Sequence, residues 1–430
     1  MTGPEPSMQS YDLIGIGVGP SNLSLAALAQ SANELTSRFY EIKPRFEWHP
    51  GLMLPEAELQ VSFLKDLVTL IDPTSPYSYL NFLHHEGRIF RALIANGLSS
   101  SRQEFEQYYR WVAEQLPSIR WGQRVKSVTL VEDHFEVACE CGDAARTTTL
   151  TLGSGQEPHV PDFAATLKGD QVLHSSELLQ VRPATSGRRV MVVGAGQSGA
   201  EVVNFLISDD AALPESLTWV SSRPGFQPID DSPFTNEWFV PEYVDHFQSL
   251  SSERRSFMLG HQRLASDGVS ESLLRKIYRR LYQLDIGGGR LRHRLVANRR
   301  VVDLRRNGDQ LAVGLHDADR SRPEHCAVDV VIFCTGYRSR FPDYLEPLRE
   351  RIATTADGFE VRADYSLNWD GPPNLRIYVQ NFAEHSHGVS DPNLSLSAWR
   401  SARILNSILG REHYRVDGYT STTSWSAGCG

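Results

Sequence analysis

The chain has 430 residues, which is too many for one small hydrophobic core, so we expect two or three domains. A formal net charge of −9 at pH 7 argues against a nucleic-acid-binding protein, and no apolar stretch is long enough to span a membrane. None of the five cysteines forms a Cys-x-x-Cys pair, which argues against a dithiol redox centre or a zinc site. We therefore expect a globular protein of the reducing cytoplasm that holds no metal.

The first predicted elements, over residues 11–42, are a strand, a helix and a second strand, with a glycine-rich turn after the first strand. The turn carries Gly15 and Gly17, and Pro20 stands where a third glycine is expected. Proline is tolerated in a first helical turn because its missing N–H would have no partner there. Glu41 ends the second strand, and an acidic residue at this place bonds the hydroxyls of an unphosphorylated adenosine ribose. The turn therefore predicts a site for FAD or NAD.

The middle of the chain predicts helices and then strands. Residues 84–118 carry apolar side chains at helical spacing, and residues 124–152 alternate as strands do. A Gly- and Pro-rich stretch at 150–161 then predicts the exit from the first domain.

A second glycine-rich turn follows the apolar strand that begins near Val190, and it has the complete spacing Gly194, Gly196 and Gly199. The next strand ends on Arg223 with no acidic residue nearby, which favours the 2′-phosphate of NADPH. At each turn, glycine allows the backbone to approach a pyrophosphate at a helix N-terminus. Taken alone, each turn could be only a tight strand-to-helix connection. The two together, with different residues for the two riboses, predict FAD at the first turn and NADPH at the second.

Later elements are a helical stretch at 257–284, a buried strand at 330–333 and a last long helix near 394–409. The predicted fold class is α/β, with two Rossmann-like dinucleotide-binding domains and a small helical substrate-binding segment.

The two nucleotide units also predict the domain bounds. We expect a discontinuous FAD-binding domain at 1–165 and 331–430, and an NADPH-binding domain at 166–330. The substrate-binding segment is expected at about 240–290, inside the NADPH-binding domain.

Five segments carry more specific motifs. They are GIGVGPSNL at 15–23, LQVSFLKDLV with its continuation at 59–80, RPGF and DDSPFTNE within 223–237, CTGY at 334–337 and SHGVSDPNLSL at 386–396. Together they resemble the microbial N-hydroxylating flavin monooxygenases, the lysine, ornithine and diamine N-monooxygenases of hydroxamate siderophore synthesis. The resemblance runs from about residue 11 to about residue 410, and the last segment resembles the lysine and diamine branch.

The resemblance implies FAD and NADPH as cofactors, with O2 and a small amine as substrates. It implies that a C4a-hydroperoxyflavin transfers oxygen to a terminal amine, and that the protein assembles as a homo-oligomer, a dimer or a tetramer. An alkylamine has a pKa near 10.4, so an apolar site that lowers the amine pKa would free the attacking lone pair.

The resemblance also implies the site residues. Catalytic roles fall to Gln60 and Asn236, and substrate contacts to Lys65, Asn236, Asp267 and Ser395. The implied FAD contacts are Gly15, Gly17, Gly19, Pro20, Asn22, Glu41, Lys43, Trp48, His49, Gln60, Thr335 and Leu394. The implied NADPH contacts are Gly194, Gly196, Gln197, Ser198, Gly199, Arg223 and Tyr337.

Simpler roles remain open for several of these residues. Lys65 could be a surface lysine paired with Asp66, Asn236 a turn residue, Ser395 a helix cap and Trp48 part of the core.

Asp267 points to the substrate. It stands where the ornithine enzymes carry an asparagine, and a carboxylate there favours a second ammonium group. The predicted substrate is therefore putrescine or cadaverine, with L-lysine as the first alternative and L-ornithine as the less favoured one. Lys65 complicates this prediction, because a diamine has no carboxylate to meet it. An alternative of another class is a non-catalytic NADPH-sensing protein.

Overall fold

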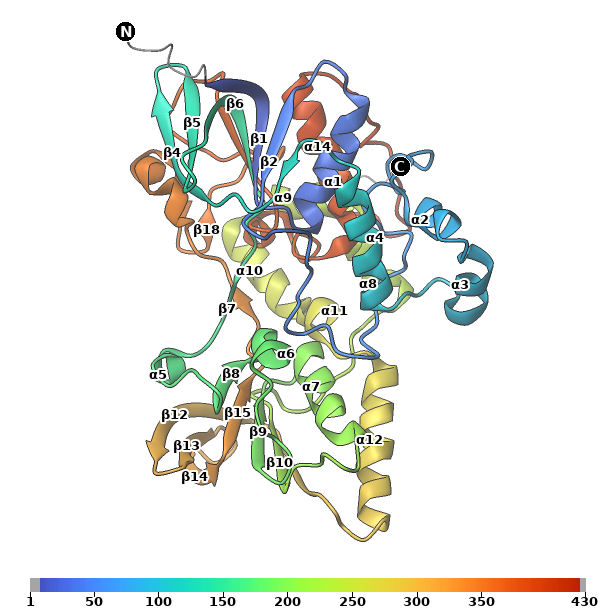
Figure 1. Ribbon diagram of the computed structural model, residues 1–430, viewed down its shortest axis with the longest axis vertical. Coiled ribbons are helices and arrows are strands. Elements are labelled where there is room, and N and C mark those ends of the chain that lie inside the picture. Colours follow the sequence, from blue (N-terminus) through green and yellow to red (C-terminus); the bar gives the residue numbers. More distant parts are fainter. Residues whose placement is uncertain (1–7, 426–430) are drawn as a thin grey trace.

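A mixed sheet and a parallel sheet organise the chain, one above the other in Figure 1. The computed structural model describes residues 8–425. Within these residues no helix is both long enough and apolar enough to cross a membrane.

The upper sheet contains the N-terminal strands and one strand from near the C-terminus. Its strands are β1 (Gln9–Ile16), β2 (Ser37–Tyr40), β3 (Ile119–Arg120), β4 (Val125–Val131), β5 (His134–Cys139), β6 (Ala144–Leu152) and β19 (Arg376–Val379). The order is β3-β2-β1-β6-β5-β4, and β19 also pairs with β6. The beginning of β6 pairs antiparallel with β5, and its end pairs parallel with β19. The first domain is therefore assembled from both ends of the chain.

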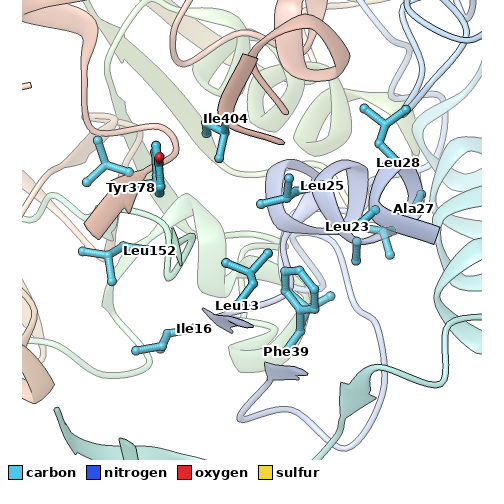
Figure 2. Packing of buried hydrophobic residues seen from close by; sticks show 14 of the residues in the cluster. Leu13, Ile16, Leu23, Leu25, Ala27, Leu28, Phe39, Leu152, Tyr378 and Ile404 are labelled. Carbon is cyan, nitrogen blue, oxygen red and sulfur yellow. The ribbon is translucent and has the colours of Figure 1, made fainter. Parts of the chain in front are cut away.

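Helices α1 (Pro20–Leu28) and α14 (Ser397–Leu409) pack against each other beside this sheet. Figure 2 shows the core between them, where Leu13 of β1, Leu25 of α1 and Ile404 of α14 are fully buried. Burying an aliphatic side chain of this size contributes about 1.5–3 kcal/mol. Helices α2 (Tyr79–His85), α3 (Ile89–Asn96) and α4 (Arg102–Glu114) follow on the same unit.

The lower sheet is entirely parallel and has the order β11-β10-β9-β15-β8. Its strands are β8 (Val172–His174), β9 (Arg189–Val193), β10 (Ser216–Val220), β11 (Arg292–Val296) and β15 (Val330–Phe333). Helices α7 (Gln197–Ser208) and α12 (Glu271–Ile286) pack together beside it. A three-stranded antiparallel sheet is formed by β12 (Arg299–Asn307), β13 (Gln310–Asp317) and β14 (Arg322–Val328).

The pairing of β15 corrects the predicted domain boundary. This strand pairs with β9 and β8 of the lower sheet, so a boundary between residues 330 and 331 would cut it from its partners. A short run of buried apolar residues looks the same for either sheet, which is why the sequence could not assign it. The chain passes between the two units through β7 (Glu157–Pro158) and β16 (Tyr337–Arg338), which pair antiparallel. The boundary therefore lies after Phe333.

The predicted helical segment divides between the two units. Helices α9 (Pro241–Ser249) and α10 (Ser252–His261) pack on α13 (Glu384–His387), whereas α12 packs on α7. Helix α11 (Arg263–Asp267) lies between them in the chain and near the junction in Figure 1. The remaining short elements are η1 (Ala29–Ser31), α5 (Asp162–Ala165), η2 (Ser175–Glu177), α6 (Leu178–Val181), α8 (Pro233–Asn236), η3 (Glu237–Phe239), η4 (Asp343–Arg351), β17 (Thr354–Thr355), β18 (Gly358–Phe359) and η5 (Leu394–Leu396).

Candidate active site

A cleft of about 980 Å³ lies where the two units and the helical segment meet. Several residues singled out from the sequence line it: Trp48, His49, Gln60, Ser198, Asp267, Thr335, Tyr337 and Leu394. Residues from distant parts of the chain are thus brought to one place.

The first glycine-rich turn fits a dinucleotide. Gly17 has φ +83°, and a Cβ atom there would lie 2.6 Å from the carbonyl oxygen of Gly153. Gly19 is the N-cap of α1 and provides no side-chain cap, so the first N–H groups of the helix remain free for phosphate oxygens. The carboxylate of Glu41 accepts a hydrogen bond from the N–H of Val18 at 2.6 Å, which places it beside the same turn.

Asn22, an expected FAD contact, directs its side chain into the protein, and its contact with FAD stays a prediction. Its side chain is fully buried, and its amide donates to the carbonyl oxygen of Gly17 at 2.8 Å. Its oxygen accepts hydrogen bonds from Thr151 and Gln380. Asn22 therefore fixes the shape of the turn and holds it to the neighbouring strands.

The second glycine-rich turn is equally constrained. Gly194 has φ +122°, and a Cβ atom there would lie 2.1 Å from the carbonyl oxygen of Cys334. A Cβ atom at Gly199 would lie 2.1 Å from the carbonyl oxygen of Gly194, so this glycine allows α7 to approach the strand closely. Gly196 is the N-cap of α7 and again provides no side-chain cap. Both turns therefore fit a pyrophosphate.

Arg223, which follows β10, contacts Asp267 at the end of α11. One guanidinium nitrogen lies 3.2 Å from Oδ2 of Asp267, and the other donates to its carbonyl oxygen at 3.0 Å. Arg263 also lies 3.4 Å from the same carboxylate oxygen. The residue expected at the 2′-phosphate and the residue expected at the substrate are thus in direct contact.

Gln60 connects three parts of the molecule. Its Nε2 donates to Oε1 of Gln197 at 3.2 Å and to the carbonyl oxygen of Gly268 at 3.5 Å. Oε1 of Gln197 also accepts the backbone N–H of Ser270 at 3.0 Å. The side chain of Gln60 is thereby held at the cleft by the first turn of α7 and by the helical segment.

Lys65 and Ser395 meet across the fold, although 330 positions separate them in the chain. Nζ of Lys65 donates to Oγ of Ser395 at 3.1 Å, and burial lowers the pKa of Lys65. Asp66 is not its partner, because that buried carboxylate accepts hydrogen bonds from the N–H groups of Val68 and Tyr79. The alternative of a surface Lys65–Asp66 pair is therefore wrong.

Asn236 is exposed at the end of α8, where its amide donates to the carbonyl oxygen of Asp231 at 2.7 Å. It does not line the main cleft, so its catalytic role stays a prediction. Trp48 has two roles at once, because its ring packs on Tyr109 with centroids 5.3 Å apart and also lines the cleft. Lys43 donates to the carbonyl oxygen of Glu47 at 2.8 Å.

Two charged residues that line the cleft were not predicted from the sequence. Arg102 lines the cleft and pairs with Glu201 of α7 at 2.8 Å. Glu384 also lines it, and desolvation in the cleft together with the nearby Asp267 raises the pKa of Glu384 to about 7. Nothing local distinguishes these residues from other charged residues, because their neighbours in space are distant in sequence.

The family model described as L-lysine 6-monooxygenase/L-ornithine 5-monooxygenase matches residues 9–339. The chain belongs to this family.

Individual relatives match along nearly the whole chain. The L-lysine N6-monooxygenase of Escherichia coli is 36% identical over 98% of this chain and 99% of that protein. A cadaverine monooxygenase of desferrioxamine biosynthesis from Erwinia amylovora, solved with FAD, is 31% identical and has a TM-score of 0.92 over 98% of this chain and 100% of that one. An ornithine N-hydroxylase of Kutzneria sp. 744, solved with reduced FAD, NADP+ and L-ornithine, is 31% identical and has a TM-score of 0.86 over 93% of this chain and 99% of that one.

The protein is therefore an N-hydroxylating flavin monooxygenase of siderophore biosynthesis that uses FAD and NADPH. The predicted family, α/β fold class and cofactors are confirmed, and the non-catalytic sensor is excluded. Among residues 8–425, no group of His, Cys, Asp and Glu side chains is placed to hold a metal ion. The homo-oligomer and the cytoplasmic location stay predictions, and Cys429 lies outside the described residues.

Proposed function

We propose that this N-monooxygenase hydroxylates one end of a small aliphatic diamine, putrescine or cadaverine. The overall reaction converts R–NH2, O2, NADPH and H+ into R–NHOH, H2O and NADP+. Bound FAD, once reduced, supplies the activated oxygen.

Carboxylates on the wall of the cleft carry this assignment. Asp357 and Glu384 line it, and neither has an ion-pair partner among the residues that the structure describes. The two cationic side chains on the wall, Arg102 and Arg263, are each paired with a carboxylate. Asp357 and Glu384 therefore remain free to accept from an ammonium group, and an approaching ammonium favours the ionised form of Glu384, which suits a substrate that carries an ammonium group at each end.

The position of Lys65 supports the same choice. An amino-acid substrate needs a cation for its carboxylate, and Lys65 is the residue that the family resemblance suggests for this role. Its ammonium donates to Ser395 and does not line the main cleft. L-lysine remains the second candidate, because the Escherichia coli relative is named for it.

The residues divide the work of catalysis in this proposal. Asp267 and Glu384 orient the far ammonium group, and Gln60, which lines the same cleft, is the side chain that the family resemblance suggests beside the flavin. The reacting nitrogen must lose its proton before it attacks. Apolar cleft residues such as Leu259 and Val389 favour the neutral amine by keeping water away.

The test is a substrate panel of putrescine, cadaverine, L-lysine and L-ornithine. NADPH oxidation and hydroxylamine formation are measured together, because oxidation alone also reports uncoupled peroxide release. We expect hydroxylamine with the highest kcat/KM from one of the two diamines. A higher kcat/KM with L-ornithine or L-lysine would refute the proposal.

A further inference from the structure

The ion pair between Arg223 and Asp267 joins two sites that the reaction uses separately. Arg223 is the residue proposed for the 2′-phosphate of NADPH, and Asp267 is the residue proposed for the amine substrate. Arg223 offers one nitrogen to the carboxylate at 3.2 Å and another to the carbonyl oxygen at 3.0 Å. Arg263 contacts the same carboxylate at 3.4 Å, so the protein itself supplies two cations to this side chain.

The backbone around Asp267 is held in place. A Cβ atom at the adjacent Gly268 would lie 2.2 Å from Cα of Ile229, so the two segments are in close contact. The N–H of Ile229 donates to Val269 at 2.9 Å, and the N–H of Val269 donates to Gln227 at 3.1 Å. Asp267 can therefore exchange partners by rotation of its side chain, which is 47% exposed, without movement of the backbone.

Asp267 also lies close to the second glycine-rich turn and to Gln60. A Cβ atom at Gly196, the N-cap of α7, would lie 3.6 Å from the carbonyl oxygen of Asp267. The next residue, Gly268, accepts the hydrogen bond of Gln60 at 3.5 Å. Asp267 thus stands between the turn expected to bind the NADPH pyrophosphate and the side chain expected beside the flavin.

We propose that the 2′-phosphate of NADPH and the carboxylate of Asp267 compete for Arg223, so that binding of NADPH frees Asp267 for the far ammonium group of the amine. This inference rests on the proposed function. A phosphate and a carboxylate repel each other, and the planar fork of one guanidinium matches one bidentate anion at a time. When Arg223 turns to the phosphate, Arg263 is the one cation left on Asp267, and an ammonium group takes the released side.

The competition makes NADPH and amine binding cooperative. Coupling between two ligands is reciprocal, so the amine tightens NADPH binding by the same factor as NADPH tightens amine binding. NADH has no 2′-phosphate and does not release Asp267. The site therefore discriminates against NADH in two ways. NADH itself binds more weakly than NADPH, and the NADH complex binds the amine more weakly than the NADPH complex.

The first measurement needs no amine. Dissociation constants of NADP+ and NAD+ are measured by calorimetry on the FAD-loaded, full-length protein and on Asp267→Asn. We expect Asp267→Asn to bind NADP+ about fivefold more tightly or better, because the amide competes poorly for Arg223, and to bind NAD+ as the unchanged protein does. The matched control is Asp303→Asn on β12, whose carboxylate pairs with Arg305 at 2.9 Å and which should change neither constant. An unchanged ratio of the two constants in Asp267→Asn overturns the proposal.

The second measurement uses the unchanged protein, so it decides even if the variant does not fold. The dissociation constant of cadaverine is determined with saturating NADP+ and with saturating NAD+. We expect binding about fivefold tighter with NADP+, and equal constants overturn the proposal. Failure of the proposed function is distinguishable, because it is seen in the substrate panel and leaves the amine-free measurement intact.

Discussion

Lys65 is the residue that tests whether the site binds a substrate carboxylate. Exchange of Lys65 for methionine removes the ammonium but keeps most of the apolar stem. A charged hydrogen bond to a substrate carboxylate contributes about 1.5–3 kcal/mol, which corresponds to roughly 10- to 100-fold in KM. Because the ammonium of Lys65 donates to Ser395 and does not line the main cleft, we expect Lys65→Met to raise the KM for L-lysine and the KM for cadaverine by less than about threefold each.

Steady-state hydroxylamine assays check this, with Lys126→Met on an exposed position of β4 as the matched control. A rise of about tenfold or more in the KM for L-lysine alone would show that Lys65 binds a carboxylate and would favour an amino-acid substrate.

His174 is the residue whose protonation should affect the stability of the fold. It is fully buried, and burial lowers the pKa of His174 from the ordinary 6.5 to about 4. Its Nδ1 accepts the N–H of Ser176 at 3.2 Å, and its Nε2 lies 3.1 Å from the carbonyl oxygen of Gly336. The neutral ring makes both hydrogen bonds. In the protonated ring Nδ1 carries a hydrogen and can no longer accept from the backbone N–H of Ser176.

The sign of the pH effect follows from linkage. Because the pKa is lower in the folded state, the unfolded chain takes up the proton first as the pH falls. The contribution is fully present above about pH 6.5 and is lost progressively down to about pH 4. We expect His174→Gln, which does not titrate, to reduce the loss of unfolding free energy between pH 7 and pH 4.5 by about 2 kcal/mol. Urea unfolding at the two pH values measures this. The exposed His261→Gln should leave the loss unchanged, and an equal effect of both exchanges would contradict the assignment.

At the scale of single elements, helix α7 carries an ion pair that connects the two units. Glu201 is 4% exposed and Arg102 is 17% exposed at their side chains. Removing one partner of such a pair leaves an uncompensated charge, whereas replacing both leaves none. We expect Arg102→Met to lower the unfolding free energy by about 3 kcal/mol and Arg102→Met/Glu201→Met to recover most of the loss. A double-mutant cycle with thermal unfolding measures the difference. A double variant that is no more stable than Arg102→Met would contradict this account.

Elements whose conformation depends on neighbouring residues in the chain could be predicted from the sequence. The glycine-rich turns were predictable because Gly17 and Gly194 adopt positive φ and leave no room for a Cβ atom. The contact of Lys65 with Ser395 and the burial of Asn22 were not predictable. Each depends on partners that only the sheet order brings together, and a local pattern contains no information on that order.

At the scale of the whole molecule, the first domain depends on its last strand and helix. Strand β19 completes the upper sheet, and α14 packs on α1 with Ile404 and Leu405 fully buried. All strands of the lower sheet lie between Val172 and Phe333. We expect a chain that ends at residue 374 to lose FAD while the lower unit stays resistant to protease.

Flavin absorbance and limited proteolysis with mass spectrometry test this prediction. The full chain is the control, and stoichiometric FAD in the shortened chain would refute it.

The placement of β19 beside β6 also sets the order in which the protein matures during translation. More than 200 residues separate the end of β6 from the start of β19. At about 10 residues per second, the ribosome needs roughly 20 s to make them. During that time the edge of β6 that will pair with β19 at Leu150 and Leu152 has no partner, and all strands of the lower sheet are made within the same interval. FAD can therefore bind only late in synthesis of the chain. Because an unpaired apolar strand edge is prone to aggregation, we expect chaperones to act in this interval.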